Sequence, residues 1–252
     1  MTSDFERDNW NEYYNAVLKG ESQQNENTLW WQVADRDALR LIKLLFEENN
    51  AISLLEAGCG SGANSLCLLK FFSIKELYLL DISEKALKVA QKHTDPILAD
   101  KITYIEGDIF DLSCLNKQFD LVWNTGVLEH YEISEIQKIV SQMYSKVKLG
   151  GYLVVGIPNR KSIAVLKAAL LGSSFGKKYL FWFKGYRNTS EILYSNRVIK
   201  EIIKKVTGKN AQIQYGGSLL WVGAFNFLIR FIDLFFKRTR FSFLSYFFIR
   251  KC

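Results

Sequence analysis

The sequence predicts an α/β fold: a mostly parallel sheet of seven strands, helices on both faces and an antiparallel last strand. Two observations predict it. Five short apolar runs alternate with helical stretches between residues 52 and 158, and two more runs follow near the C-terminus. Such alternation requires right-handed crossovers, which place helices over both faces of a parallel sheet. With 252 residues, the chain is long enough for one domain of this kind.

The five alternating runs are expected to be buried strands. They read ISLLEA, ELYLLD, ITYIEGD, FDLVWN and YLVVGIP, and they occupy residues 52–57, 76–81, 102–108, 119–124 and 152–158. The runs at 211–215 and 243–251 are expected to complete the sheet.

Helical periodicity is clearest at 134–148, where apolar residues recur every three or four positions. Ser134 and Gln137 stand at capping-box spacing and predict the start of this helix. Residues 29–48 and 196–206 are expected to be helical as well, and residues 219–240 fit a further, amphipathic helix.

The stretch LLEAGCGSGANS at 54–65 predicts a ligand-binding loop behind the first strand. In it, Gly58 permits a tight turn, Gly60 lets a ligand approach the backbone, and Gly62 opens the next helix. The spacing also fits a dinucleotide-binding loop, but the GK[ST] of a P-loop is missing. Glu56 precedes the loop, where a carboxylate would repel a pyrophosphate and attract the cationic groups of S-adenosylmethionine (SAM).

Four further segments follow the next strands in order: LYLLDIS, EGDIFDL, FDLVWNTGVLEH and LGGYLVVGIPN. Together with LLEAGCGSG, this ordered set resembles the class I SAM-dependent methyltransferases of the type 11, ubiquinone-pathway-like family. The resemblance covers residues 52–158 and implies a Rossmann-like fold, SAM as cofactor and S-adenosylhomocysteine as product.

The resemblance also implies roles for individual residues. Glu56 and the loop backbone would hold the methionine end of SAM, the loop being Gly58, Cys59, Gly60 and Gly62. Asp81 would bind the ribose hydroxyls, and Ile82 would pack on adenine. Asp108 and Ile109 would bind the adenine edge, and Asn124 and Thr125 would line the floor under the sulfonium.

His130 is the candidate general base, because it follows the fourth strand and an imidazole can take a proton near neutral pH. Its alternative role is to hydrogen-bond its own loop. The sequence shows neither the [DNS]PP[YFW] motif of DNA amino-methylating enzymes nor a Pro-Cys nucleophile, and no metal site is expected. These absences favour an oxygen nucleophile on a small, lipophilic or lipid-linked acceptor. Transfer to nitrogen or carbon stays open.

Charge divides the chain. Its net charge of +7 is the sum of −8 over residues 1–159 and +15 over residues 160–252. Segments 159–187 and 219–240 interleave cations with aromatic and aliphatic residues, which is typical of contact with an anionic membrane surface. Packing on the chain's own sheet, a homodimer and, less favoured, nucleic acid are the alternatives. The lack of a cysteine framework or leader segment predicts a cytoplasmic protein, peripheral on the inner face of the membrane.

Four parts of the chain are therefore expected: a helical lid (1–50), a SAM-binding core (51–158), a substrate cap (159–195) and a C-terminal completion of the sheet (196–252). In the lid, Tyr13 and Tyr14 are candidates to cover SAM. The alternative functional hypotheses are a soluble natural-product or sugar O- or N-methyltransferase, an RNA methyltransferase, a non-catalytic SAM-binding module and an NAD-dependent oxidoreductase.

Overall fold

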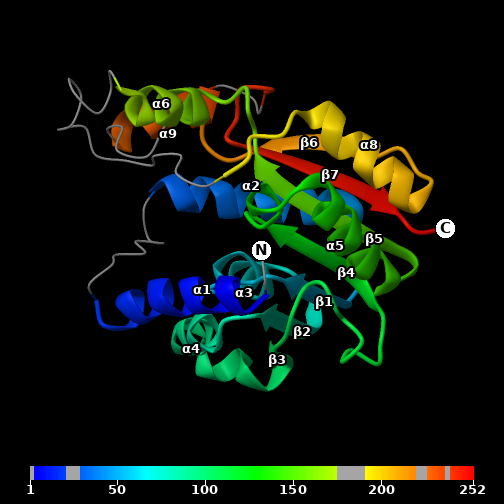
Figure 1. The fold of residues 1–252 in the computed structure, drawn as a ribbon. Coiled ribbons are helices and arrows are strands. Elements are labelled where there is room, and N and C mark those ends of the chain that lie inside the picture. Colours follow the sequence, from blue (N-terminus) through cyan, green and yellow to red (C-terminus); the bar gives the residue numbers. More distant parts are fainter. Residues whose placement is uncertain (1–2, 21–28, 175–190, 220–225, 236–238) are drawn as a thin grey trace.

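A computed structural model describes residues 3–20, 29–174, 191–219, 226–235 and 239–252. At its centre lies a seven-stranded sheet in the order β3-β2-β1-β4-β5-β7-β6 (Figure 1). The strands are β1 (Ile52–Ala57), β2 (Ile74–Asp81), β3 (Ile102–Glu106), β4 (Phe119–Thr125), β5 (Val147–Pro158), β6 (Gln212–Gly216) and β7 (Leu244–Arg250). Strand β7 runs antiparallel to both of its neighbours, whereas the pairs from β3 to β5 are parallel. The predicted Rossmann-like fold class is confirmed.

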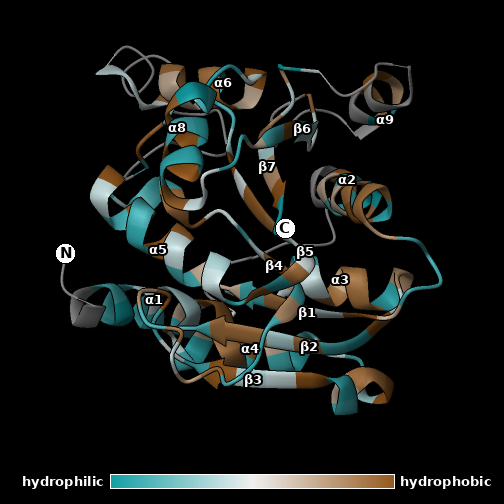
Figure 2. Cartoon of the chain, turned by 90° about the vertical axis from the view of Figure 1, so that its right-hand side faces the viewer, coloured by the Kyte–Doolittle hydropathy of each residue, from teal (hydrophilic) through white to brown (hydrophobic). Residues whose placement is uncertain are grey.

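Helices cover both faces of the sheet (Figures 1 and 2). They are α1 (Ser3–Leu18), α2 (Leu29–Leu45), α3 (Ala63–Phe71), α4 (Glu84–His93), α5 (Ile133–Ser145), α6 (Ile163–Gly172), α8 (Asn196–Thr207) and α9 (Asn226–Phe235), with 3₁₀ turns η1 (Pro96–Lys101) and η2 (Leu128–His130). Successive strand residues point to opposite faces, so each strand feeds two cores. In β1, Leu54 packs with α2 and α3, and Leu55 packs with α5 and α8.

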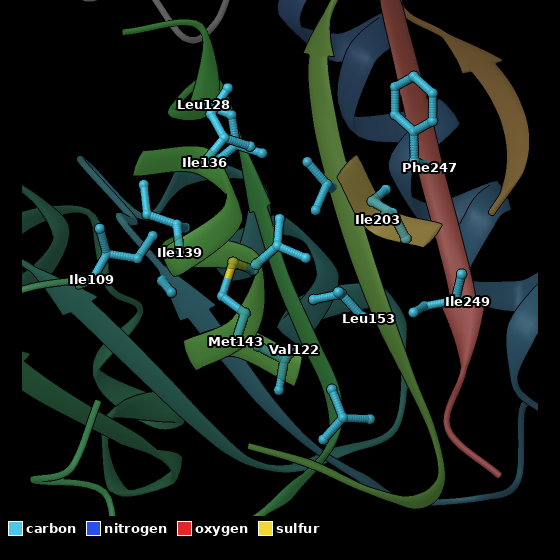
Figure 3. Packing of buried hydrophobic residues seen from close by; sticks show 14 of the residues in the cluster. Ile109, Val122, Leu128, Ile136, Ile139, Met143, Leu153, Ile203, Phe247 and Ile249 are labelled. Carbon is cyan, nitrogen blue, oxygen red and sulfur yellow. The ribbon is translucent and has the colours of Figure 1, made fainter. Parts of the chain in front are cut away.

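The core on the α5 and α8 face is continuous across the sheet. Figure 3 shows Val122 and Leu153 from the central strands packed with Ile136, Ile139 and Met143 of α5. All five side chains are at most 1% exposed. Because β1 and β4 are buried on both faces, their carboxyl ends are held rigidly where the glycine loop and the loop after β4 begin.

The predicted start and end of α5 are wrong, because the helix ends at Ser145 and β5 already begins at Val147. The capping box of α5 is formed by Glu132 and Glu135, not by Ser134 and Gln137. The helix starts at Ile133, so Ser134 already lies in the first turn. The Glu135 carboxylate accepts the N–H of Glu132 at 2.9 Å, which satisfies a donor that the helix leaves free.

The two basic, aromatic segments are described in part. Segment 159–187 contains α6, a helix that the sequence analysis did not assign, and its residues 175–187 lie outside the described residues. Of segment 219–240, α9 is described as a helix, whereas 220–225 and 236–238 lie outside. Among the described helices, none is both long and apolar enough to cross a membrane.

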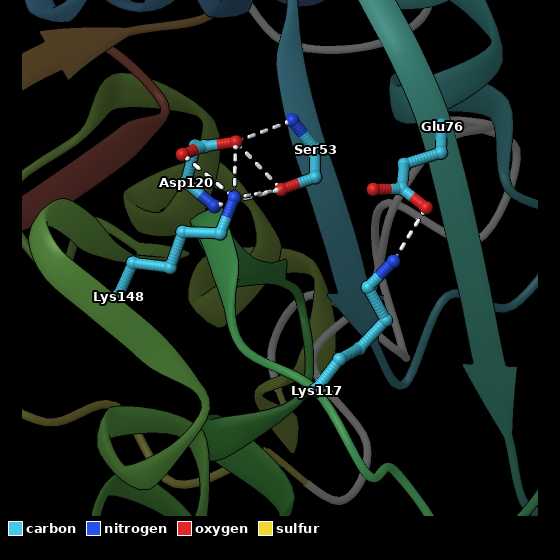
Figure 4. Close-up of polar contacts among 5 residues, drawn as sticks. All are labelled: Ser53, Glu76, Lys117, Asp120 and Lys148. Carbon is cyan, nitrogen blue, oxygen red and sulfur yellow. Dashed lines mark hydrogen bonds and ion pairs between the residues drawn. The ribbon is translucent and has the colours of Figure 1, made fainter.

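Ion pairs join the strands at the edge opposite the glycine loop (Figure 4). The Asp120 carboxylate accepts the backbone N–H of Ser53 at 2.8 Å and its hydroxyl at 2.6 Å, and Lys148 donates to it at 2.9 Å. Nearby, Lys117 pairs with Glu76 at 2.5 Å. The Asp120 cluster ties β1, β4 and β5 together, so it fixes the relative positions of the strands that carry the site.

Candidate active site

A pocket opens beyond the carboxyl ends of β1, β2, β3 and β4, where a parallel sheet of this topology binds ligands. Nine of the twelve predicted site residues line it: Gly58, Cys59, Gly60, Asp81, Ile82, Asp108, Ile109, Thr125 and His130. They come from four separate strand ends, so the sheet is what brings them together.

The glycine loop is held by the end of β2. Gly58, Gly60 and Gly62 all have positive φ, which residues other than glycine rarely adopt. The N–H of Gly60 donates to one Asp81 oxygen at 2.7 Å, and the N–H of Ser83 donates to the other at 2.9 Å. Burial raises the pKa of Asp81 above its usual 3.8, and these two N–H donors counteract the rise. Asp81 therefore sets the shape of the loop and still presents free lone pairs to the pocket.

The loop after β3 forms the opposite wall of the pocket. One Asp108 oxygen accepts the N–H of Phe110 at 2.9 Å, which leaves its second oxygen available. Ile109 is 6% exposed and adds an apolar surface beside it. An acceptor next to an apolar side chain suits a heteroaromatic ring that carries an amine.

Helix α1, which lies outside the sheet (Figure 1), contributes to the wall of the pocket. Its Trp10 and Tyr14 line the pocket, and a Cβ at Gly60 would collide with the Tyr14 hydroxyl. The helix is anchored to α4, because the Ser83 hydroxyl donates to the Asn11 side chain at 2.7 Å. Of the two tyrosines expected in a lid, Tyr14 is buried over the loop, whereas Tyr13 is 40% exposed and does not line the pocket.

His130 ends the 3₁₀ turn after β4 and contacts the edge of Trp10, with ring centroids 5.5 Å apart. Burial lowers the pKa of His130 below its usual 6.5. The imidazole is therefore neutral at pH 7 and able to accept a proton. Thr125 lies in the same wall, and its hydroxyl oxygen is buried without a hydrogen-bond partner among the described residues.

Three comparisons with known proteins place this pocket in a family. Residues 55–155 match the family described as "Methyltransferase domain". The release factor glutamine methyltransferase of Flavobacterium psychrophilum is 34% identical over 123 residues, which cover 46% of this chain and 42% of that protein. The mitochondrial ubiquinone biosynthesis O-methyltransferase of Saccharomyces cerevisiae is 27% identical over 63% of this chain and 51% of its own length. The chain thus spans about half of these relatives or less. Residues 55–155 are therefore a methyltransferase domain of the class I SAM-dependent type.

Other methyltransferases match over more of their length. The magnesium-protoporphyrin O-methyltransferase of Synechocystis is 27% identical over 81% of this chain and 80% of its own. A crystal structure of magnesium protoporphyrin IX methyltransferase from Synechocystis, with bound S-adenosylhomocysteine, covers 99% of both chains at 20% identity and a TM-score of 0.61. An N-methyltransferase of Bradyrhizobium japonicum covers 94% of this chain and 97% of its own at 16% identity and a TM-score of 0.58. The predicted family is therefore confirmed.

Three predicted methyltransferase site residues do not line the pocket. Gly62 and Asn124 lie behind its wall, where the Asn124 amide donates to the Met143 sulfur at 3.6 Å. Glu56 is 1% exposed, and one of its oxygens has no partner among the described residues. Burial raises the pKa of Glu56 from 4.5 to about 8, against the lowering effect of hydrogen bonds with Ser65. Glu56 thus stands under the loop, and a role for it in holding SAM stays a prediction.

Two aromatic side chains of the pocket, Trp10 and Tyr131, were not predicted from the sequence. A weak signal existed for the first: Trp10 lies four residues before Tyr14, which puts both rings on one face of a helix. Nothing local marks Tyr131, whose place depends on the turn at η2 and on an edge contact with Phe110 at 5.2 Å. Among the described residues there is no group of three or more His, Cys, Asp or Glu that could hold a metal ion.

Proposed function

We propose that the chain binds SAM in this pocket and transfers its methyl group to an oxygen of a small, lipophilic acceptor, leaving S-adenosylhomocysteine. The observation that carries the proposal is the convergence of the glycine loop, Asp81 and Asp108 on one pocket at the carboxyl edge of the sheet. Its support is the family, together with three relatives whose names specify O-methyl transfer.

The polar groups of the pocket fit SAM. Asp81 retains lone pairs for ribose hydroxyls, and the second Asp108 oxygen is available to the adenine amine. Thr125 adds a side chain to the wall that also contains His130.

The cofactor supplies a methyl group already activated on a cationic sulfur. The protein therefore needs to orient the acceptor, exclude water and take a proton from the acceptor hydroxyl. Trp10 and Tyr14 exclude water by covering the glycine loop. His130, neutral and in the wall next to Trp10, accepts the proton.

The lipophilic acceptor is inferred from the surface beyond the pocket. Helix α6 exposes one apolar stripe, and α9 exposes a second: Ile163, Leu166, Leu170, Phe227, Leu228 and Phe231. Both helices lie at the same end of the molecule (Figures 1 and 2). Exposed apolar side chains gathered beside cations are typical of a surface that rests on an anionic membrane, from which a lipophilic acceptor could enter.

Calorimetry tests the cofactor assignment. Wild type should bind SAM and S-adenosylhomocysteine, and NAD should not bind. Asp81→Asn keeps the side-chain shape but removes the charge that holds the loop, so SAM binding should weaken at least about tenfold. Asp100→Asn, an exposed aspartate at the end of η1, is the matched control and should bind as wild type does. Binding of NAD in place of SAM would overturn the proposal.

A further inference from the structure

A second cavity lies at the C-terminal half of the sheet. It has a volume of about 960 Å³ and runs between the loop after β5, helix α8, strand β6 and the turn before β7. It shares no lining residue with the SAM pocket. We name this cavity the basic groove. In Figures 1 and 2, α6, α8 and β6 lie at one end of the molecule.

Six of the fifteen residues that line the basic groove are cations, and Glu201 is the single carboxylate among them. The cations are Arg160, Lys161, Arg197, Lys200, Lys204 and Arg240. Glu201 already pairs with Arg197 at 2.8 Å. Among the residues that the structure describes, the other five have no carboxylate partner. Like charges held in one cavity repel one another, so an anion bound between them is favoured.

The chain builds this concentration of charge with a buried frame. Asn159 is 2% exposed, and its side-chain amide donates to the carbonyls of Arg240 at 2.7 Å and Ser242 at 2.9 Å. Its side-chain oxygen accepts the N–H of Lys161 at 3.1 Å. One buried side chain therefore holds Arg160 and Arg240, 80 positions apart in the sequence, at the same end of the groove.

Helix α8 adds a positive end at this place. Its N-cap Ser195 and first residue Asn196 line the groove, and its first turn contains no acid. The N-terminus of a helix carries a partial positive charge, which favours phosphate. Beside these donors the groove has an apolar side, formed in part by the exposed Leu166 and Phe241.

A short segment connects the groove to the SAM pocket. Ile192 donates its N–H to the carbonyl of Glu129 at 2.7 Å, and the Tyr194 hydroxyl donates to the carbonyl of Tyr131 at 2.9 Å. Tyr131 lines the SAM pocket, and Ser195, the next residue after Tyr194, lines the groove. From Ile192 to Ser195 the chain can span at most about 11 Å. The two cavities are therefore neighbours, separated by residues 192–195.

We propose that the basic groove binds the phosphate group of an amphiphilic ligand and thereby holds the acceptor, or the membrane that delivers it, against the methyl-transfer site. The ligand carries phosphate at one end and apolar surface beside it, as a phosphorylated lipophile or a phospholipid headgroup does. The inference rests on the proposed function for the role of the ligand, but the phosphate site itself does not depend on methyl transfer.

The test uses the full chain with two probes, inorganic pyrophosphate by calorimetry and phosphatidylglycerol vesicles by co-sedimentation, with phosphatidylcholine vesicles for comparison. The double variant Arg160→Gln/Arg240→Gln should bind pyrophosphate or phosphatidylglycerol about tenfold more weakly or worse. The matched control Lys92→Gln/Lys101→Gln makes the same change in net charge at exposed positions of α4 and η1, and it should bind as wild type does.

Loss of pyrophosphate binding in the groove variant, Arg160→Gln/Arg240→Gln, supports a soluble phosphorylated ligand. A preference for phosphatidylglycerol lost in that variant supports a lipid headgroup. An equal loss in both double variants, or no binding of either probe by wild type, overturns the phosphate site. SAM binding and melting temperature, measured on the same samples, show whether the variants are folded and keep failure of the proposed function separate from failure of the groove.

Discussion

Replacing Glu129 with glutamine should change how the stability of this protein depends on pH. Glu129 follows β4, is 4% exposed and has one carboxyl oxygen without a hydrogen-bond partner among the described residues. Burial raises the pKa of Glu129 from 4.5 to about 8, and the negative charge of Glu191 adds to the rise. The carboxyl is therefore protonated in the folded protein at neutral pH and ionised in the unfolded chain.

The sign follows from proton binding. Between pH 4.5 and about 8 the folded state holds a proton at Glu129 that the unfolded state has released. The free energy of unfolding therefore falls as pH rises through this interval. The stability that protonated Glu129 contributes is fully present below pH 4.5 and is lost as pH rises through about 8. At about 1.4 kcal/mol for each pH unit, the largest loss is about 5 kcal/mol. Relaxation of the site around the charge should reduce it to about 2 kcal/mol.

Urea unfolding of wild type and Glu129→Gln at intervals from pH 5 to pH 9 measures the effect. The two proteins should be similar at pH 5, where both side chains are neutral. At pH 9 the variant should be the more stable by about 2 kcal/mol. A residual slope should persist, because burial also raises the pKa of Glu56 to about 8. Glu106→Gln, an exposed change at the end of β3, should follow wild type throughout. Parallel curves for Glu129→Gln and wild type would refute the reasoning.

Three further outcomes are expected. Gly60→Ala should lower the melting temperature and SAM affinity more than Gly20→Ala does. Both glycines have positive φ, but only a Cβ at Gly60 would collide with the Tyr14 hydroxyl. Equal melting temperatures and affinities of the two variants would contradict that contact. His130→Gln should lower kcat by about 10²- to 10⁴-fold and leave SAM affinity unchanged. The kcat of the wild type should decline on the acid side of pH 6.5, because burial lowers the pKa of His130 below that value. An equal fall in SAM affinity and kcat would assign His130 to loop structure instead. Asp120→Ala should lower the free energy of unfolding, measured by urea unfolding, by about 2–3 kcal/mol, because it leaves donors from two strands unpaired. A loss under about 0.5 kcal/mol would show that the cluster in Figure 4 does not stabilise the fold.

Much of the fold and most of the SAM pocket could be predicted because their signals are local. A buried strand shows as an apolar run, and the loop at Gly58 and Gly60 shows because only glycine tolerates its backbone. Asp81 and Asp108 were placed by their position at strand ends, since the carboxyl ends of parallel strands share one edge of the sheet. The prediction of the α5 capping box failed for a local reason, because the acceptor side chains of Glu132 and Ser134, two residues apart, compete for the same helix start.

The sequence alone thus determined the five central strands, the glycine loop, and Asp81 and Asp108 beside it. Tertiary structure decided what covers and surrounds them. Trp10 reaches His130 only because α1 packs on α4, more than 70 residues away in sequence. Arg160 and Arg240 share one groove only because Asn159 joins their loops. Strands and turns can be predicted because they depend on the backbone preferences of residues that are neighbours in sequence. The Trp10–His130 contact and the shared groove of Arg160 and Arg240 depend on segments that meet only after the sheet has formed.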